Sequence, residues 1–509
     1  MTKKRDNLIT VLLMIFIACP FIRLLLTRTH LFKAAGWFET AFWWEYDRVI
    51  FLVGLFFLMI SILKHHFEMK FTPSLLFMTL FGAWMFAATY VTGFDDTVVN
   101  GTVKNVPEGL MANLGFVMFF AMTLFLFDEK KRNFVLRFFV AMATVLEILL
   151  LVDFYILDKS WNLNNYMFYQ FNHTGYFLVC AVVADAMVYM TAETGNGKIL
   201  GALLTVLGTQ ALIINNTLGA YIGVGFGLVF IVIVHSIINK KFRFDYCVPL
   251  LLAVLSVLAV NMLSADAAAI VSKNGADFLS NLKAAADPKN APGSAGTGRL
   301  VMYRKAVEMI REKPLFGWGW QASMEGILES SNGYTGLCHC EYLQYAMIYG
   351  LPAALFYVAG VFAVFLRALR FRDQLTKSNL FGLCVAFAYC VSAASGNAMF
   401  MTAPYLFIFL ALGYVPERIN RPADETAEPA AAPETAAPGS APEISMHAFD
   451  SSQASGNSST AAPASAPETA APGSAPSFEQ AADVLRPAAR PAGQAAPSLE
   501  NSQIFTDND

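Results

Sequence analysis

Residues 198–238 read KILGALLTVLGTQALIINNTLGAYIGVGFGLVFIVIVHSII, two apolar runs separated by the polar tripeptide Asn215-Asn216-Thr217. Each run has about twenty residues, which is the length that an α-helix needs to cross the hydrocarbon core of a bilayer. Backbone N–H and C=O groups find no water there, so each run must be helical. The stretch therefore predicts two membrane-spanning helices joined by a tight polar turn at one membrane boundary.

Similar apolar runs occur on both sides of this pair. We expect spans near 8–27, 47–64, 72–92, 109–127, 134–157, 173–191, 198–215, 217–238, 246–264, 342–366, 379–396 and 400–416. Hydrophobic residues make up 56% of the chain and charged residues 14%. Soluble domains contain roughly 45–50% hydrophobic residues and about 25% charged residues. The sequence thus predicts an all-α fold, a polytopic membrane helix bundle of about twelve transmembrane helices.

Lysine and arginine gather in alternate connections between these runs. With the N-terminus inside, the inside segments hold eighteen of these residues and the short outside loops hold five. Short loops rich in positive charge stay in the cytoplasm, so we expect both termini there. The net charge of −3 gives no basic field for nucleic acid, and we expect no nucleic-acid partner.

The predicted topology divides the chain into four segments. Residues 1–264 carry spans one to nine, 265–341 form an extracytoplasmic loop, and 342–416 carry spans ten to twelve. Residues 417–509 form a tail that repeats APETAAPGSAP at 432–442 and 466–476. Such a composition buries too little apolar surface to fold, so we expect a disordered Ala/Pro-rich cytoplasmic tail.

The long loop contains a predicted amphipathic helix. Residues 299–312 have helical periodicity, with Thr297 or Gly298 as the cap and Pro314 just beyond the end. Its apolar face is expected to contain Met302, Tyr303, Ala306, Val307 and Ile310. Arg299 falls on this face. Its side chain either reaches back to water, or a helix lying on the membrane surface directs it into a site, where a guanidinium fits phosphate oxygens bidentately.

A second polar group lies where the loop meets the tenth predicted span, at Cys338-His339-Cys340-Glu341. His339 is therefore expected at the outer membrane boundary, where an imidazole can act as a base. A purely structural histidine is the alternative. A metal site is disfavoured because the cysteine spacing differs from the usual Cys-x2-Cys pair of zinc sites. His173 begins the sixth predicted span on the same side and could reach the same site.

These motifs together resemble the O-antigen ligase and O-antigen polymerase family of bacterial polytopic membrane glycosyltransferases. The resemblance rests on Gly298-Arg299, Pro314-Leu-Phe-Gly-Trp-Gly319, His339-x-Glu-Tyr-Leu-Gln344 and Gly350-Leu351, and on a long loop that follows nine spans. It covers about residues 200–366 well and the remaining chain by span count. It implies an enzyme that transfers a glycan from undecaprenyl diphosphate to an acceptor on the outer face of the bacterial cytoplasmic membrane. The acceptor would be a lipid-anchored sugar, a second lipid-linked repeat or a protein hydroxyl.

The resemblance also implies roles for individual residues. Arg299 would engage the diphosphate and His339 would activate the acceptor, with no metal required. The sequence departs from the family at Leu218, where many relatives carry an arginine. Arg304, Arg311 or Arg48 could replace that cation. As further substrate-binding residues we expect Arg304, Asn215, Asn216, His173 and Glu341.

A multi-span transporter or flippase, of a small solute or a lipid-linked glycan, is the alternative function. Glu147 and Asp153 fall in the fifth predicted span, where charged groups are costly and often line a transport path. A transporter should also show internal repeats or helices broken near the membrane midplane. The sequence shows no clear inverted repeat. A structural membrane protein with a binding tail is a third alternative.

Overall fold

The computed structural model describes residues 2–28, 41–63, 72–101, 109–168, 170–286, 298–331 and 335–415. Within these ranges the chain forms α-helices and two short 3₁₀ helices and no strand, which confirms the all-α class. The tail predicted at 417–509 and the residues 287–297 of the loop lie outside the described ranges.

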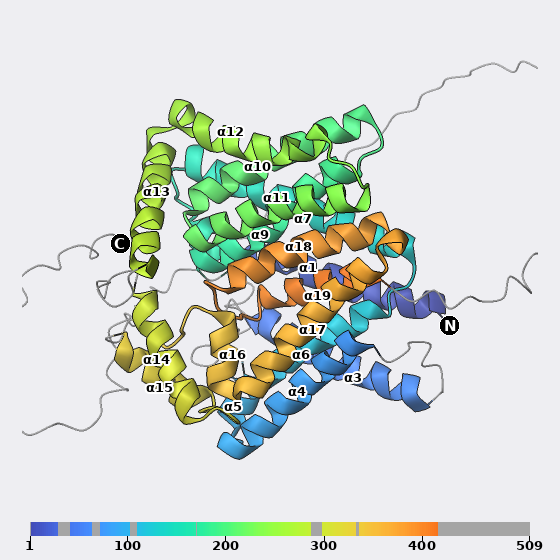
Figure 1. The fold of residues 1–509 in the computed structure, drawn as a ribbon, viewed down its shortest axis with the longest axis vertical. Helices are drawn as coiled ribbons and strands as arrows, with labels where there is room; N and C mark the ends of the chain where they lie inside the picture. The colour runs from blue at the N-terminus through green and yellow to red at the C-terminus, as the bar shows by residue number, and fades with distance from the viewer. Residues whose placement is uncertain are drawn as a thin grey trace, which may run out of the picture. The chain divides into compact units, whose positions relative to one another are not determined.

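Figure 1 shows the helices of the described ranges. Their bounds are α1 Thr2–Arg28, α3 Ala41–Leu63, α4 Pro73–Thr92, α5 Asp96–Asn100, α6 Leu110–Leu124, α7 Glu129–Tyr155, α8 Leu163–Tyr166, α9 Phe171–Thr191, α10 Gly195–Asn215, α11 Leu218–Ile238, η1 Phe244–Cys247, α12 Val248–Leu263, α13 Ala265–Ala286, α14 Arg299–Glu312, α15 Trp320–Ser330, α16 Glu341–Tyr349, α17 Leu351–Arg370, η2 Arg372–Gln374, α18 Lys377–Ala393 and α19 Ala403–Gly413.

Several of these helices have the length and apolar composition of membrane spans. In the described ranges seven do, or eight if a pair bent by 114° between α12 and α13 counts as one span. The protein is therefore a multi-pass membrane protein. The figure of about twelve spans stays a prediction, because α6, α18 and α19 are apolar but shorter than a full crossing.

The predicted span at 342–366 is wrong as a single helix. The structure breaks it at Gly350 into α16 and α17. Gly350 has a φ of 88°, which favours glycine, and Pro352 in the first turn of α17 cannot continue the preceding helix. The segment 314–319 packs against the break, where the Leu351 N–H donates to Pro314 O at 2.8 Å and the Trp318 N–H donates to Met347 O at 2.9 Å. These contacts satisfy backbone groups that the break exposes.

The long loop is more helical than expected. The helix predicted at 299–312 is present with those bounds as α14, but α13 and α15 were not predicted. The prediction of the apolar face of α14 was wrong at one residue. Val307 is 37% exposed, and Met309, which was not predicted, is buried. This face packs against α15 and α16. Figure 1 shows α13 turning away from α12 and running past the end of α10 toward α14.

Close packing around α9 brings distant parts of the chain together. α9 contacts α7, α10, α11 and α18. Gly223 and Gly227 of α11 allow a near approach to α18, because a Cβ at Gly227 would lie 2.7 Å from the Ala388 Cβ. The start of α11 is thereby held beside the segment that links α18 to α19. This arrangement positions the site described next.

Candidate functional site

A cleft of about 670 Å³ lies at the ends of these packed helices that the sequence predicts to face outward. It opens where α9, α11 and α14 begin, and one side of α13 forms a further wall. The lining residues are Gln170, Phe171, Asn172, His173, Asn216, Thr217, Leu218, Lys273, Asn274, Asp277, Ser280, Asn281, Arg299, Thr335, Leu337, His339 and Asn397.

Three helix N-termini meet at this cleft. α9 begins at Phe171, α11 at Leu218 and α14 at Arg299, and all three residues line it. The first N–H groups of a helix have no partner within the helix and carry the positive end of its dipole. Such termini bind phosphate and carboxylate groups. The three starts therefore place the positive ends of three helix dipoles at the cleft.

The polar turn at 215–217 shapes this wall as the sequence predicts. Asn216 ends α10 with a φ of 65°, a left-handed conformation that asparagine tolerates. The buried Asn215 donates from Nδ2 to Phe171 O at 2.9 Å, and Thr217 donates from Oγ1 to the same oxygen at 3.3 Å. Gly175 permits this approach, because a Cβ there would lie 2.7 Å from Asn215 Oδ1. The starts of α9 and α11 are thus joined side by side.

Two cations and one carboxylate line the cleft. Arg299 is half-buried and Lys273 of α13 is exposed, and neither has an ion pair within the described part of the chain. Asp277 follows Lys273 by one turn of α13. Because the two cations exceed the single carboxylate, the cleft carries net positive charge when its histidines are neutral.

His339 is held by Asn397 from the segment between α18 and α19. The backbone N–H of His339 donates to Asn397 Oδ1 at 2.8 Å, and Asn397 Nδ2 lies 3.2 Å from the ring Nδ1. The hydroxyl of Tyr303 donates to His339 O at 2.9 Å. These bonds fix His339 in a left-handed conformation, with a φ of 54°. Burial, aided by the nearby Arg299 charge, lowers the pKa of His339 to about 4, so the ring is neutral at physiological pH.

His173 lies in the same cleft, as predicted. Only 6% of its surface is exposed, and within the described ranges its buried Nδ1 has no hydrogen-bond partner. Its ring packs edge-on against Tyr176, which in turn donates its hydroxyl to Ser395 O at 2.9 Å. Tyr176 therefore joins α9 to the segment that carries Asn397, and His173 packs beside it.

The structure places other predicted residues outside the cleft lining. Asn215 is fully buried in the turn contacts described above. Glu341 is also fully buried, where its Oε1 accepts from Tyr357 at 2.6 Å and its Oε2 accepts from Tyr389 at 3.4 Å. Its carboxylate joins α16, α17 and α18, and burial raises its pKa to about 7. This geometry gives Asn215 and Glu341 structural positions rather than contact with a ligand in the cleft.

The cations considered as replacements at Leu218 are also elsewhere. Arg304 and Arg311 lie on the exposed side of α14, and neither lines the cleft. Arg48 donates to Glu45 at 3.3 Å and to Asn100 at 2.9 Å. Lys273 is the cation that shares the cleft with Leu218 and Arg299.

Sequence reasoning missed Lys273, Asp277 and Asn397. Lys273 and Asp277 belong to the unpredicted helix α13, in which their four-residue spacing places them on one face. Asn397 belongs to the break between the last two predicted spans, where a polar residue between apolar runs was the available signal. Within the described ranges no group of three or more His, Cys, Asp and Glu side chains could hold a metal, and metal independence stays a prediction.

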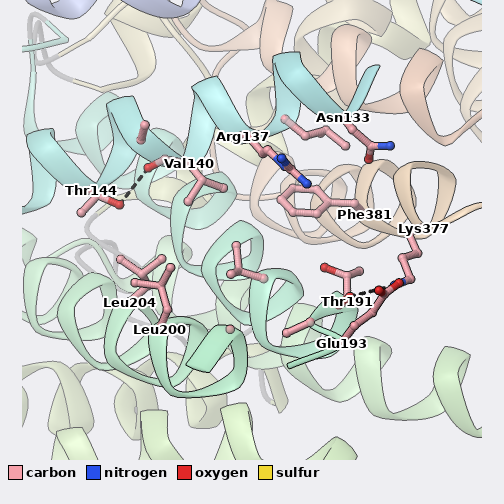
Figure 2. Close-up of a pocket in the computed structure, with 15 residues that line it drawn as sticks. Asn133, Arg137, Val140, Thr144, Thr191, Glu193, Leu200, Leu204, Lys377 and Phe381 are labelled. Carbon is pink, nitrogen blue, oxygen red and sulfur yellow. Dashed lines mark hydrogen bonds and ion pairs between the residues drawn. The ribbon is translucent and has the colours of Figure 1, made fainter. Parts of the chain in front are cut away.

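A larger cavity of about 880 Å³ lies at the other ends of α9 and α10, beside α7 and α18. Figure 2 shows Lys377 turned toward Glu193 and Thr191, and it pairs with Glu193 at 2.5 Å. The remaining walls are largely aliphatic, with Arg137 at one side. The lining of this cavity contains no histidine, so we do not assign it the chemistry.

Comparison with known families agrees with the motifs. Residues 203–358 match the family model described as O-antigen ligase. The matched region runs from α10 into α17 and includes Lys273, Arg299 and His339. No curated protein matches the chain. The resemblance seen in the motifs is confirmed: residues 203–358 of this multi-pass membrane protein are similar to the O-antigen ligase family.

Proposed function

We propose that this protein is a membrane glycosyltransferase. It transfers a glycan from undecaprenyl diphosphate to an acceptor hydroxyl on the outer face of the bacterial cytoplasmic membrane, with both termini of the enzyme in the cytoplasm. One observation carries the proposal: a single cleft joins Arg299, Lys273 and three helix N-termini with His339. This combination suits an anionic leaving group beside a hydrogen-bonding side chain.

The reaction breaks the bond between the anomeric carbon and the diphosphate oxygen and forms a bond to the acceptor oxygen. Positive charge develops on the sugar while negative charge grows on the leaving diphosphate. Cationic groups that stabilise the negative charge on the diphosphate lower the barrier. Arg299 provides a planar fork for two phosphate oxygens. Lys273 provides a second positive charge on the wall where Leu218 replaces the family arginine.

The acceptor hydroxyl loses a proton as its oxygen bonds to the sugar. The cleft lining offers His339, which the resemblance implies, and Asp277, the carboxylate of α13. Either group must come within hydrogen-bond reach of the acceptor to act as the base. The acceptor is a lipid-anchored sugar in a ligase, a second lipid-linked repeat in a polymerase, or a protein hydroxyl.

The test uses the full chain in lipid nanodiscs with a pool of lipid-linked glycans and candidate acceptors. Release of undecaprenyl diphosphate is measured for the wild type, Arg299→Ala and His339→Ala. Arg137→Ala serves as the control, because it removes an exposed arginine from the other cavity. We expect release that depends on Arg299 and His339 but not on Arg137. Product length then distinguishes a ligase from a polymerase. Wild-type protein that releases nothing with any acceptor would contradict the proposal.

A transporter or flippase remains the second candidate. The observation that favours it is the pair of fully buried carboxyl groups of Glu147 in α7 and Asp185 in α9, which lie against Gly208 of α10. The break at Gly350 does not favour it, because the segment 314–319 fills that break. Transport of labelled solute or lipid-linked glycan into sealed vesicles, lost in Glu147→Gln and unchanged in Arg299→Ala, would support this reading.

A further inference from the structure

We propose that Asn397 holds neutral His339 in the tautomer whose proton is on Nε2, so that His339 donates a hydrogen bond into the cleft and is not the base for the acceptor. The identity of the ligand, a diphosphate oxygen, rests on the proposed function. The tautomer rests on geometry alone.

The amide of Asn397 can have one orientation only. One of its two ends lies 2.8 Å from the backbone nitrogen of His339, which carries a hydrogen and can only donate. That end must therefore be Oδ1, the acceptor. The other end is then the NH₂ group, and it lies 3.2 Å from Nδ1 of the same histidine. Two donors cannot bond each other, so Nδ1 must present its lone pair.

A neutral imidazole carries one hydrogen. With Nδ1 accepting from Asn397, the hydrogen is on Nε2. Within the described ranges Nε2 has no hydrogen-bond partner, and His339 lines the cleft, which leaves this N–H for a ligand. A general base acting through Nε2 needs the opposite tautomer, with a hydrogen on Nδ1 and the lone pair on Nε2.

The surroundings make this arrangement rigid. Asn397 is 4% exposed, and Gly396 beside it packs so closely on Tyr176 that a Cβ would lie 2.2 Å from the Tyr176 hydroxyl. Tyr303 donates both to His339 O at 2.9 Å and to Ala394 O at 3.3 Å, and so ties the two segments together. The amide therefore cannot rotate away without breaking contacts on both sides.

The charges that face His339 favour the neutral ring. Arg299 of α14 opposes its protonation, while Lys273 and Asp277 of α13 are the other charged groups of the cleft lining. His173 of α9 is the other titratable ring there, and Glu341, although two residues away, turns its carboxylate into α17 and α18. The neutral ring keeps its Nε2–H for an anionic oxygen, and Asp277 is the carboxylate of the cleft lining that can accept the acceptor's proton.

The direct test is the ring tautomer. Histidine labelled with ¹⁵N in both ring nitrogens is incorporated into the full chain in nanodiscs, and the His339 signals are identified by their loss in His339→Gln. At pH 7 we expect a protonated Nε2 and an unprotonated Nδ1. A protonated Nδ1 would overturn the inference. This measurement needs no substrate, so it decides the tautomer even if glycosyl transfer is never observed.

The functional test is Asn397→Asp, which keeps the acceptor for the backbone N–H but places a carboxylate oxygen at Nδ1. That oxygen favours a hydrogen on Nδ1 and raises the pKa of His339. If His339 is a donor, Asn397→Asp remains active at low pH, where the imidazolium still carries Nε2–H. It loses activity roughly 10- to 100-fold as pH rises and that hydrogen is lost, as expected for one hydrogen bond to a charged group.

A base would give the opposite profile, with Asn397→Asp active at high pH and inactive at low pH, and this outcome would refute the donor role. Asn172→Asp is the matched control. It adds a carboxylate to the same cleft from α9 without belonging to the Asn397–His339 pair, so it should not reproduce the new pH dependence.

Discussion

Replacing Arg299 with glutamine should slow glycan transfer about 100-fold in kcat/KM. Arg299 begins α14 at the cleft, is half-buried, and has no carboxylate partner within the described ranges, so its charge is available to a ligand. A guanidinium makes two parallel hydrogen bonds to a phosphate. Each charge-assisted bond contributes about 1.5–3 kcal/mol. Because the cleft is open to solvent, we take the lower value for both bonds, about 3 kcal/mol, which corresponds to roughly 100-fold in rate.

Arg299→Lys separates charge from geometry. Lysine keeps the positive charge but loses the planar fork, so we expect about a tenfold loss, equivalent to one of the two bonds. The assay is release of undecaprenyl diphosphate at several substrate concentrations, with Arg137→Gln as the control in the other cavity. The loss should shrink at high salt, because half-exposed charges are screened.

A loss in kcat/KM below about threefold in Arg299→Gln would refute this reasoning. Such a loss is smaller than the loss expected from removing a single hydrogen bond to a charged group. An equal loss in Arg137→Gln would refute it in another way, because it would show a general effect of removing positive charge. Thermal unfolding of each variant distinguishes lost contacts from lost folding.

Lys273→Gln should reduce kcat/KM about tenfold and Lys273→Arg should restore most of it, because the first removes one charge-assisted contact and the second keeps the charge; the same release assay measures both. Burial lowers the pKa of His339 to about 4 from an ordinary value of ~6.5, so the unfolded chain binds this proton more readily. The free energy of unfolding should therefore be unaffected by this histidine above pH ~6.5 and should decrease as pH falls toward 4. Thermal unfolding of His339→Gln over the same pH range should show a smaller decrease. Gly350→Ala should lower the unfolding temperature markedly, because φ is 88° and a Cβ would lie 2.0 Å from Leu315 O. Gly225→Ala should not, because a Cβ at this helical glycine meets nothing within 4 Å, and equal losses in the two variants would contradict the steric argument.

The membrane architecture was readable from the sequence because it follows from local composition. A run of about twenty apolar residues has to be a helix in hydrocarbon, whatever surrounds it. The helix at 299–312 was predictable for a related reason, since its periodicity, its preceding glycine and its following proline all lie within the segment. Arg299 and His339 both belong to the motifs that resemble the O-antigen ligase family, and the structure brings both to one cleft.

Predictions failed where contacts between distant segments decide the structure. Apolar composition alone made 342–366 one span, but the break at Gly350 depends on a partner segment near Leu315. Val307 has the periodicity of a buried residue, yet the partners of α14 leave it 37% exposed. Periodicity indicates that a face is apolar, and the neighbouring helices determine which part of it is covered.

Residues near one another in the chain were enough to predict an all-α membrane protein, the helix that starts at Arg299 and the resemblance of the surrounding segment to O-antigen ligases. Which groups share the cleft depends instead on the packing of distant segments. Asn397 lies 58 residues from His339, and Lys273 lies on a helix that the sequence did not predict. The close packing of α9, α11 and α18 brings Asn397 to the histidine ring. The tautomer of that ring depends on its neighbour's hydrogen-bonding atoms, so no local pattern could have determined it.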